Sequence, residues 1–309
     1  MGFDTAYEAI TEESDTHRWA FGTGFTDPLA GVDTGVPEGV DGADLAAYCL
    51  MLGDDALIMS HRLQEWLSRA PELEEDTALA NIALDLLGQV RLLLTRAGAA
   101  DGSGRTEDDL AFGRAEREFR NVRLAEITDA DFADLVARLL IFSTWRLALL
   151  VALRDSADPV LAAIAAQGVK EVTYHRDYAA QWVIRLGDGT EFSRERIVAG
   201  LAAVAPFVAE LFDVSPAEQR LAGAGVAVDP AGLRSELDGV MAAVLAEAGL
   251  TESGLTESGP GEASQPWPSV PGLAGVSGQA GREGVHTEAM GYVVAELQSV
   301  ARSLPGATW

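Results

Sequence analysis

Hydrophobic residues recur every three to four positions over most of the sequence, the spacing of one face of an α-helix. Clusters of β-branched residues are few, so the pattern predicts an all-α protein. Asp44 and Asp158 are suited to cap the first and fourth helices, with Pro159 at the first position of the latter. The predicted long helices span residues 44–69, 72–96, 132–154 and 158–186, followed by shorter ones at 195–212, 230–248 and 287–304.

A very short connection around Pro71 joins the first two predicted helices. A connection of that length makes the two helices run antiparallel and side by side. Counting residues outward from the turn places Gly53 opposite Gly88. We therefore predict close helix packing through these two small residues.

The second predicted helix carries a polar row through a segment that is apolar on nearly every face, the pattern of a helix buried on all sides. Asn81, Asp85 and Gln89 follow one another at intervals of four and so share a face. A buried carboxylate needs partners, because an unpaired charge in an apolar interior is costly. The apolar seam of the fourth helix contains two ionisable groups, Glu171 and His175. We predict that these five side chains form one buried polar cluster.

The same positions correspond to those that bind metal in some helical bundles. Four-helix proteins that hold two irons use inward carboxylates and two Glu-x-x-His pairs. Here Asp85 is followed at that spacing by Gly88, and Glu171 by Tyr174, with His175 one place too late. The expected fold is a ferritin-like helical bundle with additional C-terminal helices and a degenerate metal site. We predict neither a bound metal nor a catalytic residue in this chain.

Composition and charge restrict the possible partners. The 309 residues carry a formal net charge of −26, which opposes binding to nucleic acid or to an anionic membrane. Cys49 is the only cysteine, so no internal disulfide forms, as is usual in a reducing cytoplasm. The acidic N-terminus lacks the apolar segment of a signal peptide, and the longest apolar run, 139–153, is too short to cross a bilayer. We expect a cytoplasmic protein with no nucleic-acid or membrane partner.

Two segments differ in composition from the rest. Residues 1–43 hold nine acidic residues and one basic residue, Arg18, which favours an acidic N-terminal arm of low order. Residues 249–284 contain the motif LTESG twice and are typical of a flexible low-complexity loop. The helical domain is expected to span residues 44–309 around this loop.

Four arginines recur every three residues after the second predicted helix: Arg114, Arg117, Arg120 and Arg123. The spacing predicts a solvated or salt-bridged row. A contact with phosphate or with a partner is the alternative.

Several stretches resemble one known family. They are LGDDALIMSHRLQEW (52–66), PELEEDTALANIALDLLGQVR (71–91), AAIAAQGVKEVTYH (162–175), RLGDGT (185–190), AELFD (209–213) and HTEAMGYVVAELQSVARSLPGATW (286–309). In this order, from about Tyr48 to the C-terminus, the sequence resembles the structural C subunits of bacterial phenylacetyl-CoA 1,2-epoxidases. The acidic arm and the LTESG loop lie outside this pattern.

The resemblance implies a ferritin-like fold without a working metal site. In that family a sister subunit holds the di-iron centre and binds the acyl-CoA. The C subunit pairs with it and supports it, a small bridging subunit joins assemblies, and a flavin and iron–sulfur reductase delivers electrons from NADPH. The expected function is a non-catalytic structural subunit in aerobic phenylacetate degradation, with no cofactor bound by this chain. Two other classes stay open: a free-standing di-iron oxidase or oxygenase using Asp85, Glu171 and His175, and a ferritin-type scaffold protein.

Overall fold

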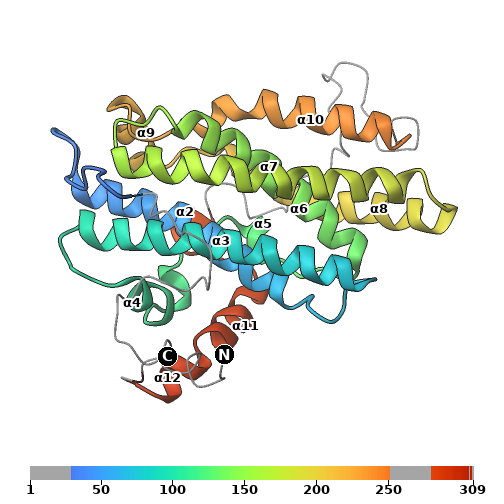
Figure 1. Ribbon diagram of the computed structural model, residues 1–309, viewed down its shortest axis with the longest axis horizontal. Coiled ribbons are helices and arrows are strands. Elements are labelled where there is room, and N and C mark those ends of the chain that lie inside the picture. The colour runs from blue at the N-terminus through green and yellow to red at the C-terminus, as the bar shows by residue number, and fades with distance from the viewer. Residues whose placement is uncertain (1–28, 251–279, 306, 308–309) are drawn as a thin grey trace, which may run out of the picture.

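The computed structural model describes residues 29–250, 280–305 and 307 of the chain (Figure 1). Within these ranges every regular element is an α-helix or a short 3-10 helix, so the all-α prediction is confirmed for this part of the chain. Four long helices form the core, close to their predicted positions. They are α2 (Gly42–Gln64), α3 (Leu73–Ala100), α6 (Phe132–Leu153) and α7 (Pro159–Gly187).

The four long helices form two antiparallel hairpins, α2 with α3 and α6 with α7 (Figure 1). Trp66, just after α2, packs edge-on against Phe132 at the start of α6, with ring centroids 6.3 Å apart. At the other end, Arg96 of α3 pairs with Asp158, which precedes α7. Residues 101–131 therefore cross the length of the bundle, and α3 and α6 run parallel. A bundle with one such crossover has the ferritin-like chain path.

Capping residues fix where two of the long helices begin. The carboxylate of Asp158 accepts a hydrogen bond from the backbone N–H of Leu161 (2.8 Å), and Pro159 is the first helical residue, as predicted. Helix α2 starts earlier than expected, because Asp41 caps it by accepting from the backbone N–H two residues on (2.8 Å). Asp44 is thus a first-turn residue, and the prediction that it caps α2 is wrong.

The predicted contact between Gly53 and Gly88 is wrong. Helix α2 ends at Gln64, so the connection to α3 is longer than expected and the register of the hairpin changes. A Cβ atom on Gly53 would lie 2.9 Å from Leu94 Cδ2, whereas one on Gly88 would have no neighbour within 4 Å. Gly53 therefore does permit close helix packing, but against Leu94.

Shorter elements complete the fold around the bundle. The crossover contains α4 (Glu107–Phe112), the 3-10 turn η1 (Glu116–Glu118) and α5 (Arg123–Glu126). After α7 follow α8 (Glu191–Val204), η2 (Ala205–Phe207), η3 (Ala209–Phe212), α9 (Pro216–Gly223), η4 (Pro230–Leu233), α10 (Arg234–Glu247), η5 (Gly281–Glu283), α11 (Glu288–Leu297) and α12 (Ser299–Ser303). Helices α8 and α10 pack on α6 and α7, whereas α11 packs on α2 and α5 (Figure 1).

The later helices are shorter than predicted, for identifiable reasons. In place of the single helix expected at 195–212, α8 ends at Val204 and two 3-10 turns follow. Pro206 has no N–H and cannot continue the α-helical hydrogen-bond pattern. The expected helix at 287–304 is divided at Gln298, whose buried amide donates to two carbonyls of the crossover (3.0 and 2.9 Å). The helix expected at 230–248 begins with a 3-10 turn before α10.

The two compositionally distinct segments are only partly described. Residues 1–28 of the predicted arm and residues 251–279 of the predicted loop lie outside the described residues. The remainder of the arm packs on the bundle, where Arg96 donates to the carbonyl oxygens of Thr34 and Gly35 (2.9 Å for the latter).

Two fully buried carboxylates of α2 bind distant segments of the chain. Asp54 accepts from both terminal nitrogens of Arg114 in the crossover (Nη1 to Oδ2, 2.8 Å). Asp55 forms a two-bond pair with Arg282, which precedes α11 (both 2.9 Å). Because a buried carboxylate requires such a partner, these pairs fix both segments against α2.

The four arginines are partly salt-bridged, as predicted, but they do not form one row. The crossover is divided into short turns, so a three-residue spacing does not keep side chains on one face. Arg114 and Arg123 are buried, and Arg123 pairs with Glu210 (2.8 Å). Arg120 donates to backbone carbonyls, and Arg117 is exposed.

Helices α3 and α6 are long and apolar enough to cross a membrane, judged by length and composition. In α6, 83% of the most apolar stretch is buried inside the protein, which accounts for its composition. The corresponding fraction in α3 is 44%, since one face, including Asn81 and Leu84, is exposed. The prediction that α3 is buried on all sides is therefore wrong.

The Asp55–Arg282 pair gives a test of how the C-terminal segment is held. We predict that Arg282→Ala lowers the free energy of unfolding by about 3–5 kcal/mol, because it leaves a buried carboxylate unpaired. Arg220→Ala is the matched control, since Arg220 pairs with Asp44 at the surface and its side chain is 62% exposed. That control should lose much less, because solvent screens an exposed ion pair. Urea unfolding followed by circular dichroism measures both, and equal losses would contradict the prediction.

Candidate functional site

The structure brings four of the five predicted polar residues into two contacts between α3 and α7. His175 Nε2 lies 3.0 Å from Asp85 Oδ2. Gln89 Nε2 donates to Glu171 Oε2 (2.9 Å). Asn81 is exposed and its inclusion was wrong. Residues four apart differ by about 40° in direction around an α-helix, so the row rotates from the interior at one end to solvent at the other.

The Asp85–His175 contact lies at the edge of the bundle. The His175 side chain is 1% exposed and that of Asp85 is 37% exposed. Solvent screens a carboxylate in such a position, so its interaction contributes about 1 kcal/mol or less. Glu171 is half-buried, and its other oxygen accepts from Gln167 (2.8 Å).

A buried guanidinium lies between the helices of the bundle. Arg146 of α6 is 1% exposed, and its Nε and Nη2 both donate to Gln89 Oε1 (3.0 and 2.9 Å). Its Nη1 donates to the carbonyl oxygen of Leu52 in α2 (3.2 Å). Through Gln89 the contacts continue to Glu171, so one side chain connects all four long helices.

The charge and space around Arg146 suit this arrangement. Burial lowers the pKa of Arg146 to about 10, while the negative charges of Asp55 and Glu171 oppose that shift. The group therefore remains a cation at neutral pH. Gly168 of α7 leaves room for Gln89, because a Cβ atom there would lie 3.3 Å from the Gln89 amide.

Sequence analysis misses Arg146. The available signal is a single cation within the most apolar run of the sequence, 139–153. In a buried helix such a charge must have partners from neighbouring helices. Its partners are distant in sequence, so the pattern does not identify them.

The residues at the bundle centre do not fit a di-iron site. At the two positions where a histidine would follow a carboxylate, Gly88 has no side chain and Tyr174 is 51% exposed. The Arg146 cation, bound to Gln89 beside Glu171, would repel a metal ion. In the described part of the chain, His and carboxylate ligand atoms gather within 4.8 Å in two other groups. These are His61 with Glu65 and Glu296, and Glu72 with Glu74 and Glu75.

Comparison with known proteins identifies the family of the chain. Residues 36–309 match the profile of the family described as Phenylacetic acid catabolic protein. The chain belongs to this family. It is also 41% identical over 265 residues, covering 86% of this chain and 99% of the relative, to the C subunit of the 1,2-phenylacetyl-CoA epoxidase of Escherichia coli (strain K12). The family has a ferritin-like helical fold, so the expected fold and the resemblance are both confirmed.

The contacts of Arg146 predict a large effect of its removal. Arg146→Ala leaves two buried acceptors, the Gln89 side-chain carbonyl and the Leu52 carbonyl, without these donors, and should cost about 2–5 kcal/mol of unfolding free energy. Arg176→Ala is the control in α7, because Arg176 contacts only the exposed Asp177 in its ion pair. It should cost less than about 1 kcal/mol. A loss below 1 kcal/mol for Arg146→Ala in urea unfolding would show that the buried network is not needed for stability.

Proposed function

We propose that this chain is a non-catalytic structural subunit of a multicomponent phenylacetyl-CoA 1,2-epoxidase. It would pair with a di-iron catalytic subunit and support it in aerobic phenylacetate degradation. The observation that carries this proposal is Arg146 with Gln89 and Glu171 at the bundle centre, where di-iron bundles place metal ligands. The relative from Escherichia coli is named as the C subunit of such an epoxidase, which supports the same assignment.

The contribution of such a subunit is a rigid surface for its partner. Inside the bundle, Gln89 of α3 binds Arg146 of α6 and Glu171 of α7, and a satisfied buried network of this kind holds the helices in fixed positions. Leu84 of α3 and Tyr174 of α7 are 45% and 51% exposed. They lie at the same level of the bundle, because the residues that follow them, Asp85 and His175, are in contact. Exposed apolar side chains on adjacent helices are typical of interaction surfaces, so we assign the partner contact to this face of α3 and α7.

The proposal also assigns the other components of the reaction. Iron would reside in the catalytic subunit, and flavin and iron–sulfur groups in a reductase that uses NADPH, while O2 is consumed by the complex as a whole. This chain would bind none of these cofactors. A small bridging subunit would join assemblies. The formal net charge of −26 favours a less acidic protein partner over nucleic acid or a membrane, and a cytoplasmic location is consistent with that charge.

The two alternative functions have less support. A free-standing di-iron oxidase would need Asp85, Glu171 and His175 as ligands. The contacting atoms of Asp85 and His175 are engaged with each other, and both Glu171 oxygens accept hydrogen bonds from glutamine side chains. A ferritin-type scaffold would assemble with copies of itself and would not require a different partner.

The proposed face predicts which substitutions prevent assembly. Leu84→Glu and Tyr174→Glu place charges in an apolar contact and should weaken binding of the di-iron subunit at least about 30-fold, or about 2 kcal/mol. Phe192→Glu, at an exposed apolar position of α8, is the control and should bind normally. The measurement is copurification of the di-iron subunit after co-expression, with epoxidation of phenylacetyl-CoA assayed on the same preparations.

Circular dichroism should show that all three variants are folded, since the substituted side chains are exposed. Loss of both copurification and turnover in the first two variants supports the proposal. A di-iron subunit that is stable and fully active without this chain would disprove the supporting role. Normal assembly of Leu84→Glu and Tyr174→Glu would disprove only the assignment of the face.

A further inference from the structure

A second group of ligand-type side chains lies between α2 and α11, away from the bundle centre. His61 and Glu65 are four residues apart on α2 and therefore share a face, and Glu296 extends from α11. One ligand atom from each residue lies within 4.8 Å of the other two. We propose that His61, Glu65 and Glu296 form a mononuclear site for a divalent transition-metal ion such as Zn²⁺.

The imidazole of His61 is the first observation that supports a ligand here. Its Nε2 atom is shielded from solvent and has no hydrogen-bond partner among the residues that the structure describes. A shielded ring nitrogen without a partner is unfavourable, and a metal ion that accepts its lone pair removes that cost. Burial lowers the pKa of His61, against the opposing charges of Glu65 and Glu296. An imidazole coordinates a metal ion through the lone pair of a neutral ring nitrogen.

The two carboxylates complete a chemically suitable donor set. Arg62 donates to both oxygens of Glu65 and so fixes its orientation, as outer hydrogen bonds do for metal-ligating carboxylates. Glu296 is exposed, and its side chain can turn toward the ion. The two carboxylates supply two negative charges, one of which also pairs with Arg62. One nitrogen and two carboxylate oxygens are typical ligands of Zn²⁺.

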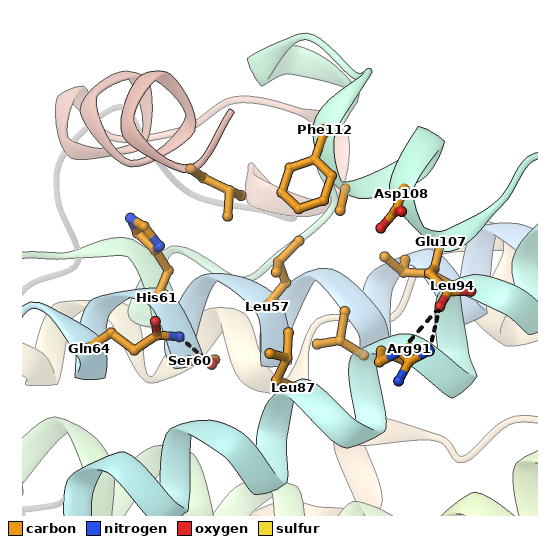
Figure 2. A pocket seen from close by; sticks show the side chains of 13 residues that line it. Leu57, Ser60, His61, Gln64, Leu87, Arg91, Leu94, Glu107, Asp108 and Phe112 are labelled. Atoms are coloured by element: carbon orange, nitrogen blue, oxygen red, sulfur yellow. Dashed lines mark hydrogen bonds and ion pairs between the residues drawn. The ribbon is translucent and has the colours of Figure 1, made fainter. Parts of the chain in front are cut away.

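One of the three proposed ligands borders a cavity. His61 lines a cavity of about 310 Å3 between α2, α3, α4 and α11, and Leu297 of α11 lines it as well. In Figure 2, His61 projects upward from α2 at the left end of this cavity, and the Arg91–Glu107 ion pair lies at the right end. Three protein ligands leave a coordination position open, which a water molecule from the cavity can fill. Ligand atoms of a tetrahedral ion lie roughly 3.3 Å apart, so small rotations of the two glutamate side chains suffice.

A metal ion at this position would connect helix α11 directly to the bundle. Helix α11 follows the segment 251–279 in sequence and packs on α2. An ion that binds only the folded chain raises its stability with ion concentration. The site is thus structural, and it does not depend on the proposed role in the epoxidase.

The test uses the full-length chain after removal of metals with a chelator. Isothermal titration with Zn²⁺ should give one ion per chain, and Co²⁺ should produce visible absorption from a low-symmetry site. His61→Gln and Glu296→Gln should each weaken Zn²⁺ binding at least tenfold and abolish the Co²⁺ absorption. Glu74→Gln, in the other acidic group, is the control and should bind as the unaltered chain does. Zn²⁺ should raise the Tm of the unaltered chain and of the control only.

Three results would overturn the proposal. The first is a titration in which Zn²⁺ does not bind at a ratio near one ion per chain. The second is equal Zn²⁺ affinity in all four proteins, which would identify adventitious binding to an acidic surface. The third is a Tm that Zn²⁺ raises equally in His61→Gln and in the unaltered chain. If His61→Gln fails to fold, the Zn²⁺ affinity and Tm of Glu296→Gln are compared with those of the unaltered chain instead, because Glu296 is exposed and its replacement should not prevent folding.

Discussion

A guanidinium buried at the centre of a four-helix bundle must find partners on several helices at once, and this structure depends on that constraint. Arg146 donates to Gln89 of α3 and to the carbonyl of Leu52 in α2, and Gln89 in turn donates to Glu171 of α7. The amide of Gln89 faces the cation with its oxygen and the carboxylate with its nitrogen. The arrangement keeps the four helices in register without a metal. It is also the observation on which the proposed supporting role rests.

The same physical rule operates outside the centre. Asp54 and Asp55 are adjacent on α2 and fully buried, and each is paired with an arginine from a segment far away in sequence. Arg114 thereby fixes the crossover, and Arg282 fixes the start of the C-terminal segment. Removing one member of such a pair costs more than the pair itself contributes, so other arrangements of these segments are strongly disfavoured. Both segments are therefore held against α2.

Local signals in the sequence were sufficient for the four long helices and for the Asp158–Pro159 helix start, because periodicity and capping act over a few residues. The pairing of Asp85 with His175 also follows from faces that could be identified beforehand. The exposure of Asn81 could not be identified beforehand, because residues spaced four apart point in directions that rotate gradually around the helix. Likewise, the Gly53 contact depends on the length of a turn that the pattern did not define. Long-range ion pairs such as Asp55–Arg282 have no local signal.

The central claim is that Arg146, and not a pair of irons, occupies the functional centre of this bundle. The most direct test is Mössbauer spectroscopy of the purified chain after anaerobic loading with isotopically enriched Fe²⁺ and exposure to O2. The account predicts no spin-coupled diferric signal, and any bound iron should be mononuclear and sensitive to His61→Gln. Two irons per chain with a coupled diferric signal that disappears in Glu171→Gln would contradict the account.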